Sequence, residues 1–262
     1  MCDDSFCKLL CNKIKERVIF NMSLDVKDKI CIVTGSTDGI GLGISKELLK
    51  RGAEVYMSGR SLEKIARLKN ELAGYGDKMH IETMDFSDKD AAEAYVAAIA
   101  ESRGIDWLFP NAGNGFVCPF EEMTQQQWEN IVNLNVYGVI ATVRGAIPTM
   151  LKQGSGNVIA TCSLGSFVPA PYMSAYALTK HAIHGLVQSL HYEYLSRGIH
   201  FAGIYPGSVV TAIFERNNVT MPENATLLNQ AIKEIFEGLE RGDAEILVCD
   251  ECRSYVQQKS GK

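Results

Sequence analysis

The chain has 262 residues and a formal net charge of -5, and 46% of its residues are hydrophobic and 22% charged. These values are typical of soluble globular proteins and exclude a fibrous chain, a mostly disordered chain and a membrane-spanning bundle. The acidic balance argues against nucleic acid as a partner, because phosphate binding needs a surplus of Lys and Arg. A chain of this length buries enough surface for one large α/β domain.

The first 28 residues differ in pattern from the rest and are predicted to form an N-terminal extension. Their apolar residues fall on one helical face, which leaves two interpretations, an interfacial amphipathic helix or a loosely docked terminus. The segment lacks the apolar core and cleavage site of a secretory signal, and no window reaches the roughly 18 apolar residues of a membrane span. We therefore expect a cytoplasmic protein without a membrane span.

The eight cysteines are expected to be reduced thiols, because the chain carries no export signal. Zinc is the alternative, and Cys7, Cys11, Cys249 and Cys252 are the candidates. Only Cys249 and Cys252 have the spacing of a ligand pair, and no second C-x-x-C pair accompanies them. We predict no metal site.

From residue 29 onward, short β-branched runs alternate with longer amphipathic stretches, a pattern typical of βαβ units and a parallel sheet. The predicted strands cover residues 30–34, 54–58, 79–84, 107–109, 157–161, 200–204 and 245–248. The predicted helices cover about 40–51, 61–74, 88–103, 124–152, 174–197 and 223–240. No repeat or low-complexity linker interrupts this pattern. The prediction is one α/β domain over 29–262, a doubly wound parallel sheet of about seven strands with helices on both faces.

A glycine-rich turn follows the first predicted strand and leads directly into a helix. Its glycines are Gly35, Gly39 and Gly41, and Thr37 and Ile40 lie between them. Without Cβ atoms, this backbone can turn tightly and approach a pyrophosphate, whose charge favours free amides and a helix N-terminus. The alternative is a turn of the same composition without a ligand. The position after the first strand favours nucleotide binding.

Acid and base chemistry is indicated by Tyr176 and Lys180, which are four residues apart at the start of a predicted helix. This spacing places both side chains on one helical face, where a lysine ammonium can lower the pKa of a phenol. The same spacing also occurs by chance on surface helices. Ser163 follows the fifth predicted strand, at the sheet edge where open α/β folds bind their ligands.

Taken together and in this order, these motifs resemble those of the short-chain dehydrogenase/reductase family. The resemblance covers about residues 28 to 250. One departure is Pro110, where many members have a second Asn before the Asn-Ala-Gly motif. The matching positions are Gly35, Gly39, Gly41, Asp85, Asn111, Gly113, Asn135, Ser163, Tyr176, Lys180, Pro206, Gly207 and Thr211.

The resemblance implies a Rossmann-type oxidoreductase in which a nicotinamide cofactor exchanges hydride with a carbonyl carbon. Tyr176 would protonate the substrate oxygen, Ser163 would position it, and Lys180 would also bind the nicotinamide ribose. Asn135 would hold a proton-relaying water, although a buried structural amide is the alternative and Asn133 is a rival position. The implied cofactor contacts are Gly35, Thr37, Gly39, Ile40, Gly41, Arg60, Asp85, Phe86, Asn111, Gly113, Tyr176, Lys180, Pro206, Gly207, Val209 and Thr211.

The choice between the two nicotinamide cofactors is predicted from charge. After the second predicted strand, where an acidic residue would bind the ribose hydroxyls of NAD, the chain has Ser58, Gly59 and Arg60. The planar guanidinium of Arg60 can pair with a 2′-phosphate, so NADP(H) is favoured over NAD(H). Asp38 is the unfavourable residue, because some NADP-using relatives carry a basic side chain there.

The predicted substrate is a neutral, hydrophobic ketone or alcohol, and the resemblance suggests hydroxysteroid-like compounds. The sequence offers an apolar wall from Phe116, Phe167, Tyr172, Met173, Ile213, Phe214 and Met221, with few basic residues to hold an anion. The resemblance also implies a homo-oligomer, with a dimer favoured, through the helices predicted at 124–152 and 174–197. The competing function is a dinucleotide-sensing binding protein that keeps the fold without turnover.

Overall fold

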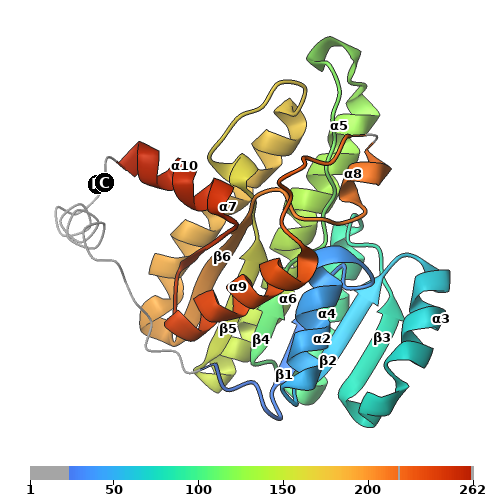
Figure 1. Cartoon of the computed structure of the whole chain (residues 1–262). Coiled ribbons are helices and arrows are strands. Elements are labelled where there is room, and N and C mark those ends of the chain that lie inside the picture. The colour runs from blue at the N-terminus through green and yellow to red at the C-terminus, as the bar shows by residue number, and fades with distance from the viewer. Residues whose placement is uncertain (1–23, 218, 261–262) are drawn as a thin grey trace.

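The strands of the chain assemble into one parallel sheet in the computed structural model, which describes residues 24–217 and 219–260 (Figure 1). The order of the seven strands is β3-β2-β1-β4-β5-β6-β7, and each neighbouring pair is parallel. They are β1 (Ile30–Val33), β2 (Glu54–Gly59), β3 (Met79–Thr83), β4 (Trp107–Phe109), β5 (Gly156–Thr161), β6 (Ile199–Pro206) and β7 (Glu245–Val248). This confirms the predicted doubly wound sheet. Most of the predicted extension, residues 1–23, lies outside the described residues.

Helices cover both faces of the sheet. The hydrophobic core on one face includes side chains from α2, α3 and α9, and the core on the other face includes side chains from α4, α6 and α7. The helices are α2 (Gly39–Lys50), α3 (Leu62–Glu71), α4 (Lys89–Arg103), α5 (Gln125–Val132), α6 (Gly138–Gln153), α7 (Ser174–Tyr194), α8 (Ile213–Arg216), α9 (Leu228–Arg241) and α10 (Asp250–Ser260).

The prediction differs from the structure at three places. The helix expected at 124–152 is interrupted by a π-helical stretch, Asn133–Tyr137. The helix expected from 223 begins only at Leu228, because the preceding residues form a turn and Thr226 pairs with Val209. The short α8 and the polar α10 were not predicted, since neither carries a long amphipathic pattern.

Side-chain caps explain where several helices begin. Asp38 caps α2 by accepting a hydrogen bond from the Gly39 amide, and Ser61 caps α3 through the Lys64 amide. Thr124 and Gln127 form a reciprocal capping box at the start of α5. Such caps satisfy amides that have no partner within the helix.

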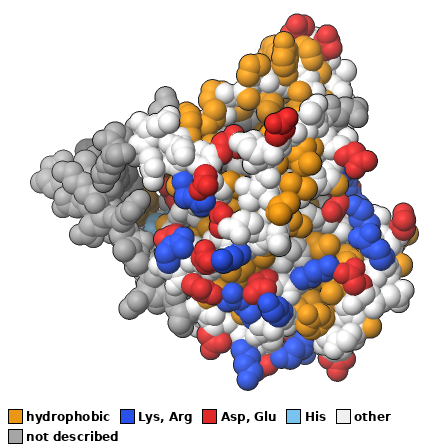
Figure 2. Space-filling model, viewed as in Figure 1, with side chains coloured by type: hydrophobic (Ala, Val, Ile, Leu, Met, Phe, Trp, Pro, Cys, Tyr) orange, Lys and Arg blue, Asp and Glu red, His pale blue; other side chains and the backbone are white. Residues whose placement is uncertain are grey.

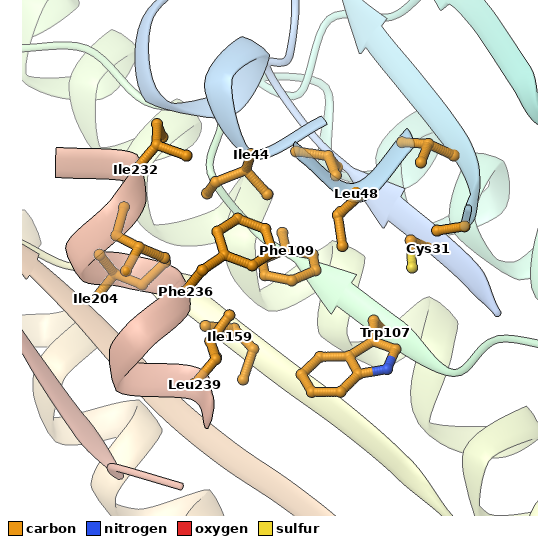
Figure 3. Close-up of a cluster of buried hydrophobic side chains, with 14 of the residues drawn as sticks. Cys31, Ile44, Leu48, Trp107, Phe109, Ile159, Ile204, Ile232, Phe236 and Leu239 are labelled. Carbon is orange, nitrogen blue, oxygen red and sulfur yellow. The ribbon is translucent and has the colours of Figure 1, made fainter. Parts of the chain in front are cut away.

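The core on the α2 face of the sheet includes side chains of α9 (Figure 3). Phe236 and Ile232 of α9 lie against Ile44 and Leu48 of α2, and both helices cover the strand residues beneath them. Phe236, Ile44 and Leu48 are buried, so this contact holds the glycine-rich turn, which precedes α2, against the sheet.

The helical run Gln125–Gln153 is long and apolar enough to cross a membrane by length and composition. Half of its most apolar window is nevertheless buried inside the protein. Its residues Val139, Val143 and Ala146 pack in the core with α4 and α7. This part of the run therefore contributes to the core.

Candidate active site

A cavity of about 650 Å³ opens at the carboxyl edge of the sheet. Parallel open sheets bind ligands at this edge, where the strand order reverses, and here β1 lies between β2 and β4. Gly41 and Asn135 do not line the cavity. The other predicted site residues do line it, namely Gly35, Thr37, Gly39, Ile40, Arg60, Asp85, Phe86, Asn111, Gly113, Ser163, Tyr176, Lys180, Pro206, Gly207, Val209 and Thr211.

Two glycines of the turn are required by geometry. Gly35 has a positive φ of 61°, and a Cβ added there would lie 2.7 Å from the Cα of Ala112. A Cβ on Gly41 would lie 2.3 Å from Nδ2 of Asn111. Any larger residue would therefore push the turn away from the strand-four loop, so the glycines allow a close backbone approach.

Asn111 joins the ends of three strands beneath this turn. Its Nδ2 donates to the carbonyl oxygens of Thr34 and Gly35 at 3.0 and 3.1 Å, and its Oδ1 accepts from Thr161 Oγ1 at 3.1 Å. The Thr34 hydroxyl accepts hydrogen bonds from the amides of Asn111 and Ala112. These hydrogen bonds hold the cavity floor in one geometry. They form although Pro110 stands in place of a second Asn before the Asn-Ala-Gly motif.

Charged side chains gather at the end of the cavity beside β2. Arg60 lies 3.9 Å from Asp85, measured from Nη1 to Oδ2, and Lys64 Nζ is bonded to Oδ2 of Asp38. Burial opposes ionisation of Asp38, but hydrogen bonds from Lys64 and the Gly39 amide outweigh it and hold the pKa of Asp38 below its usual value. Lys64 thus neutralises Asp38, the acidic residue that disfavoured NADP binding in the sequence-based prediction.

Ser163, Tyr176 and Lys180 meet at the middle of the cavity. The Ser163 hydroxyl caps the 3₁₀ turn Leu164–Ser166 by accepting from the Gly165 amide at 3.0 Å, and it is hydrogen-bonded to the Tyr176 hydroxyl. Lys180 Nζ lies 5.8 Å from the Tyr176 ring centroid and donates to the Thr161 carbonyl at 2.8 Å. The α7 spacing and the end of β5 thus bring these side chains together.

The pKa values of this group differ from the prediction. Burial raises the pKa of the Tyr176 phenol, and the hydrogen bond with Ser163 only partly opposes this shift. Burial also lowers the pKa of Lys180, which is 7% exposed. The expected lowering of the Tyr176 pKa by Lys180 is therefore not found in the protein alone, because burial acts against the charged form of both groups.

Asn135 is buried within the π-helical stretch and connects three segments. Its Nδ2 donates to the Asn114 carbonyl at 2.9 Å and to Thr179 Oγ1 at 3.1 Å, and its Oδ1 accepts from the Asn114 amide at 2.9 Å. Thr179 in turn donates to the Tyr176 carbonyl. Both N–H groups of Asn135 are thus used by protein acceptors, so a water could bond its side chain only through Oδ1.

The apolar wall is only partly as predicted. Phe116, Met173, Ile213 and Phe214 line the cavity, and Met221 lines a small adjacent hollow. Phe167 instead packs against His184 and Tyr205, with both pairs of ring centroids 4.9 Å apart. Tyr172 is 64% exposed and does not line the cavity. The wall is completed by unpredicted residues, namely Val117, Leu134, Leu164, Val168, Ala170 and Val219.

The surface beside the apolar wall of the cavity is also rich in hydrophobic side chains. Hydrophobic side chains gather over α5, whereas charged side chains crowd the end of the molecule with α2 and α3 (Figure 2). Val117, Phe120 and Met221 are among the exposed apolar residues of this part of the chain. The two ends of the cavity therefore differ in chemical character.

Besides Lys64, the polar lining residues that were not predicted include Asn114, Arg216 and Glu251. Asn114 follows the Asn-Ala-Gly motif, and its Oδ1 is buried with no hydrogen-bond partner in the described structure. Arg216 belongs to α8 and lies close enough to Asp38 to help lower its pKa. Glu251 belongs to α10. No sequence signal marks these positions, since loops and short helices far along the chain bring them to the cavity.

The described cysteines are free thiols. Burial raises the pKa of Cys162, which precedes Ser163, to about 11, and that of Cys252 to about 12. Within residues 24–217 and 219–260, no group of His, Cys, Asp and Glu is arranged to hold a metal ion. Cys7 and Cys11, which completed the alternative zinc set, lie outside the described residues.

Comparison with known proteins adds a family match. The model of the short chain dehydrogenase family matches residues 29–222. A D-β-hydroxybutyrate dehydrogenase from Rhizobium meliloti is 34% identical over 191 residues, which cover 72% of this chain and 74% of the relative.

Solved structures with the same fold contain nicotinamide cofactors. A short chain dehydrogenase/reductase from Burkholderia phymatum, in complex with NAD, has a TM-score of 0.81 at 21% identity and covers 91% of this chain and 95% of its own. A gluconate 5-dehydrogenase from Burkholderia cenocepacia, in complex with NADP and tartrate, has a TM-score of 0.68 at 26% identity and covers 74% of this chain and 77% of its own. Relatives of this chain thus bind either cofactor.

Proposed function

Because this chain belongs to the short-chain dehydrogenase/reductase family, we propose that it is an NADP(H)-dependent oxidoreductase that interconverts a ketone or aldehyde with an alcohol. The observation that carries the proposal is the group formed by Ser163, Tyr176 and Lys180, which meets in the same cavity as the glycine-rich turn. The position of the turn supports dinucleotide binding, because Gly35, Thr37 and Gly39 line the cavity at the N-terminus of α2.

In the proposed mechanism, the bound nicotinamide supplies the hydride, and the residues of this chain position the carbonyl and move a proton. The Ser163 hydroxyl holds the substrate oxygen, and the Tyr176 hydroxyl donates its proton to that oxygen during reduction. Lys180 lies on the same face of α7 as Tyr176, where it would support this step and would bind the nicotinamide ribose. In the reverse direction, the positive charge of the oxidised nicotinamide would help to lower the pKa of Tyr176, which the protein alone does not do.

Asn135 is assigned a positioning role in this mechanism. It connects the Asn114 backbone to Thr179, one residue from Lys180 and three from Tyr176. The proposed relay water would bond its Oδ1, which has capacity for a second hydrogen bond.

Replacement of Tyr176 tests the proposal. Tyr176→Phe removes only the hydroxyl, so we expect NADPH affinity to be unchanged and kcat to fall by about 10³-fold or more. Stopped-flow and steady-state NADPH oxidation with a panel of ketones measure turnover, and fluorescence titration measures binding. Near-full activity in Tyr176→Phe would overturn the mechanism. A wild-type protein that binds NADPH and reduces no carbonyl compound would instead favour the alternative, a dinucleotide-sensing binding protein.

The preference for NADP(H) is proposed from the charges beside β2. Arg60 is 63% exposed in its side chain and only weakly paired with Asp85, which leaves its guanidinium available to a 2′-phosphate. Lys64 supplies a second cation and also neutralises Asp38.

Arg60→Ala is expected to weaken NADPH binding by about tenfold or more and to change NADH binding little, because only NADPH has the 2′-phosphate. Arg67→Ala on α3 is the control for a surface arginine, since Arg67 does not line the cavity. Equal losses of affinity for both cofactors would contradict the preference.

The proposed substrate is a neutral, hydrophobic ketone or secondary alcohol, including hydroxysteroid-like compounds, in a cytoplasmic enzyme. The apolar lining from Phe116, Met173 and Phe214 supports this class. By contrast, the hydroxybutyrate for which the Rhizobium meliloti relative is named carries a carboxylate. Comparison of uncharged ketones with keto acids, by NADPH oxidation, tests the class, and exclusive use of keto acids would contradict it.

We also propose that the enzyme is a homodimer formed through α7 and the helical run from α5 to α6. An uncharged, exposed stripe on α7 supports this arrangement, with Leu178, Ala182, Gly185, Ser189 and Tyr192 at spacings of three and four residues. Space is open above Gly185, so a second helix can approach closely.

A further inference from the structure

The C-terminal helix α10 is firmly docked next to the cavity. It leaves the carboxyl end of β7 (Figure 1), and its Cys252 is fully buried in the core. Arg253 donates to Glu234 at 2.9 Å, to Asp250 at 2.7 Å and to the Leu247 carbonyl at 3.1 Å. These contacts hold the first turn of α10 in one position relative to α9 and β7.

The docked helix presents Glu251 to the cavity. Its Oε2 lies beside the turn proposed to hold the nicotinamide, where a Cβ on Gly207 would be 3.0 Å away and the Ser208 amide donates at 3.4 Å. One turn farther along α10, the Tyr255 hydroxyl donates to the Phe167 carbonyl in the loop after Ser163. Glu251 lines the cavity, is exposed to solvent and takes part in no ion pair of the described structure.

The charges that line the cavity are unevenly distributed. Arg60 and Lys64 lie at the β2 end, and Arg216, two residues after Phe214 on α8, helps to lower the pKa of Asp38. Lys180 is buried and bonded to the Thr161 carbonyl. Among the described lining residues, Glu251 is therefore the acidic side chain away from the β2 end, and no ion pair of the described structure compensates its charge.

From this placement we infer that Glu251 determines substrate specificity: it repels carbonyl compounds that carry a carboxylate and accepts a hydrogen bond from a hydroxyl or ammonium group remote from the carbonyl. The remainder of the substrate packs against the apolar wall. Like charges repel, whereas a donor on the substrate finds an acceptor on a docked helix. The inference rests on the proposed carbonyl reduction and narrows its substrate class to apolar ketones with a hydrogen-bond donor.

The test uses three ketones with one skeleton: 4-phenylbutan-2-one and its para-aminomethyl and para-carboxylate derivatives. Reduction by full-length wild type, Glu251→Gln and Glu193→Gln is followed with saturating NADPH. Gln keeps the acceptor for the Ser208 amide but removes the charge, and Glu193 is an exposed control on α7. In Glu251→Gln, we expect kcat/KM for the carboxylate relative to the neutral ketone to rise by about tenfold, and that for the aminomethyl ketone to fall similarly.

Unchanged ratios in Glu251→Gln, or equal changes in Glu193→Gln, would overturn the inference. Calorimetry measures the binding of the same compounds to the NADPH-loaded proteins. It therefore tests charge selection by Glu251 separately from the proposed carbonyl reduction. If wild type reduces none of the ketones, the proposed function fails, and the binding ratios still decide whether Glu251 selects by charge.

Discussion

At the scale of single residues, Lys180 shows how the site conflicts with stability. The side chain is 7% exposed, its ammonium is bonded to one carbonyl oxygen, and burial lowers its pKa. In the unfolded chain, the Lys180 side chain keeps its proton up to a pH of about 10.4. Below that pH, the folded protein must either bury the charged ammonium or release its proton, and both cost folding free energy. Lys180 is thus retained at a cost in folding free energy that its proposed role explains.

Lys180→Met should abolish turnover and raise the free energy of unfolding by about 1 kcal/mol or more at pH 7, since it removes a poorly compensated buried polar group. The difference from wild type should shrink as the pH rises towards about 10.4, where the unfolded lysine also loses its proton. Urea unfolding at pH 7 and pH 10 measures this. The exposed Lys152→Met is the control, and a destabilised Lys180→Met would contradict the argument.

At the scale of elements, α7 serves two surfaces at once. One face carries Tyr176 and Lys180 to the cavity, and Ile183 and Val187 pack in the core. The exposed stripe that includes Ala182 and Gly185 carries no charge. A single helix of 21 residues therefore links the proposed dimer contact to the proposed catalytic residues.

Sedimentation velocity should give a mass of twice the 28.8 kDa chain for the wild type. Ala182→Arg places a long charged side chain in the middle of the stripe, so we expect a shift to monomer at micromolar concentration. Ala98→Arg, an exposed position on α4, is the control for the substitution itself. A wild-type monomer, or a dimer that is unaffected by Ala182→Arg, would contradict the proposed interface.

At the scale of the whole molecule, the strand order decides where chemistry can occur. The chain leaves β1 on one side for β2 and β3 and returns on the other side to β4, so loops diverge between β1 and β4 and open the cavity. The family match ends at residue 222, yet α9, β7 and α10 complete the sheet, the core over α2 and the substrate end of the cavity.

The sequence by itself determined the seven strands and the order of the motifs, because buried β-branched runs and glycine-rich turns depend on local chemistry. It also identified Ser163, Tyr176 and Lys180, whose α7 spacing and strand-end position follow from regular geometry. It did not predict the π-helical stretch around Asn135, since both helix types have the same apolar periodicity over so few residues.

Only the tertiary structure decided which distant residues meet. Lys64 neutralises Asp38 across 26 residues, and α10 brings Glu251 beside Gly207. Tertiary packing also decided the pKa direction of Tyr176, because burial outweighed the lysine four residues along the helix. Charge and burial act through space, so contacts between segments that are far apart in sequence leave no local pattern to predict them from.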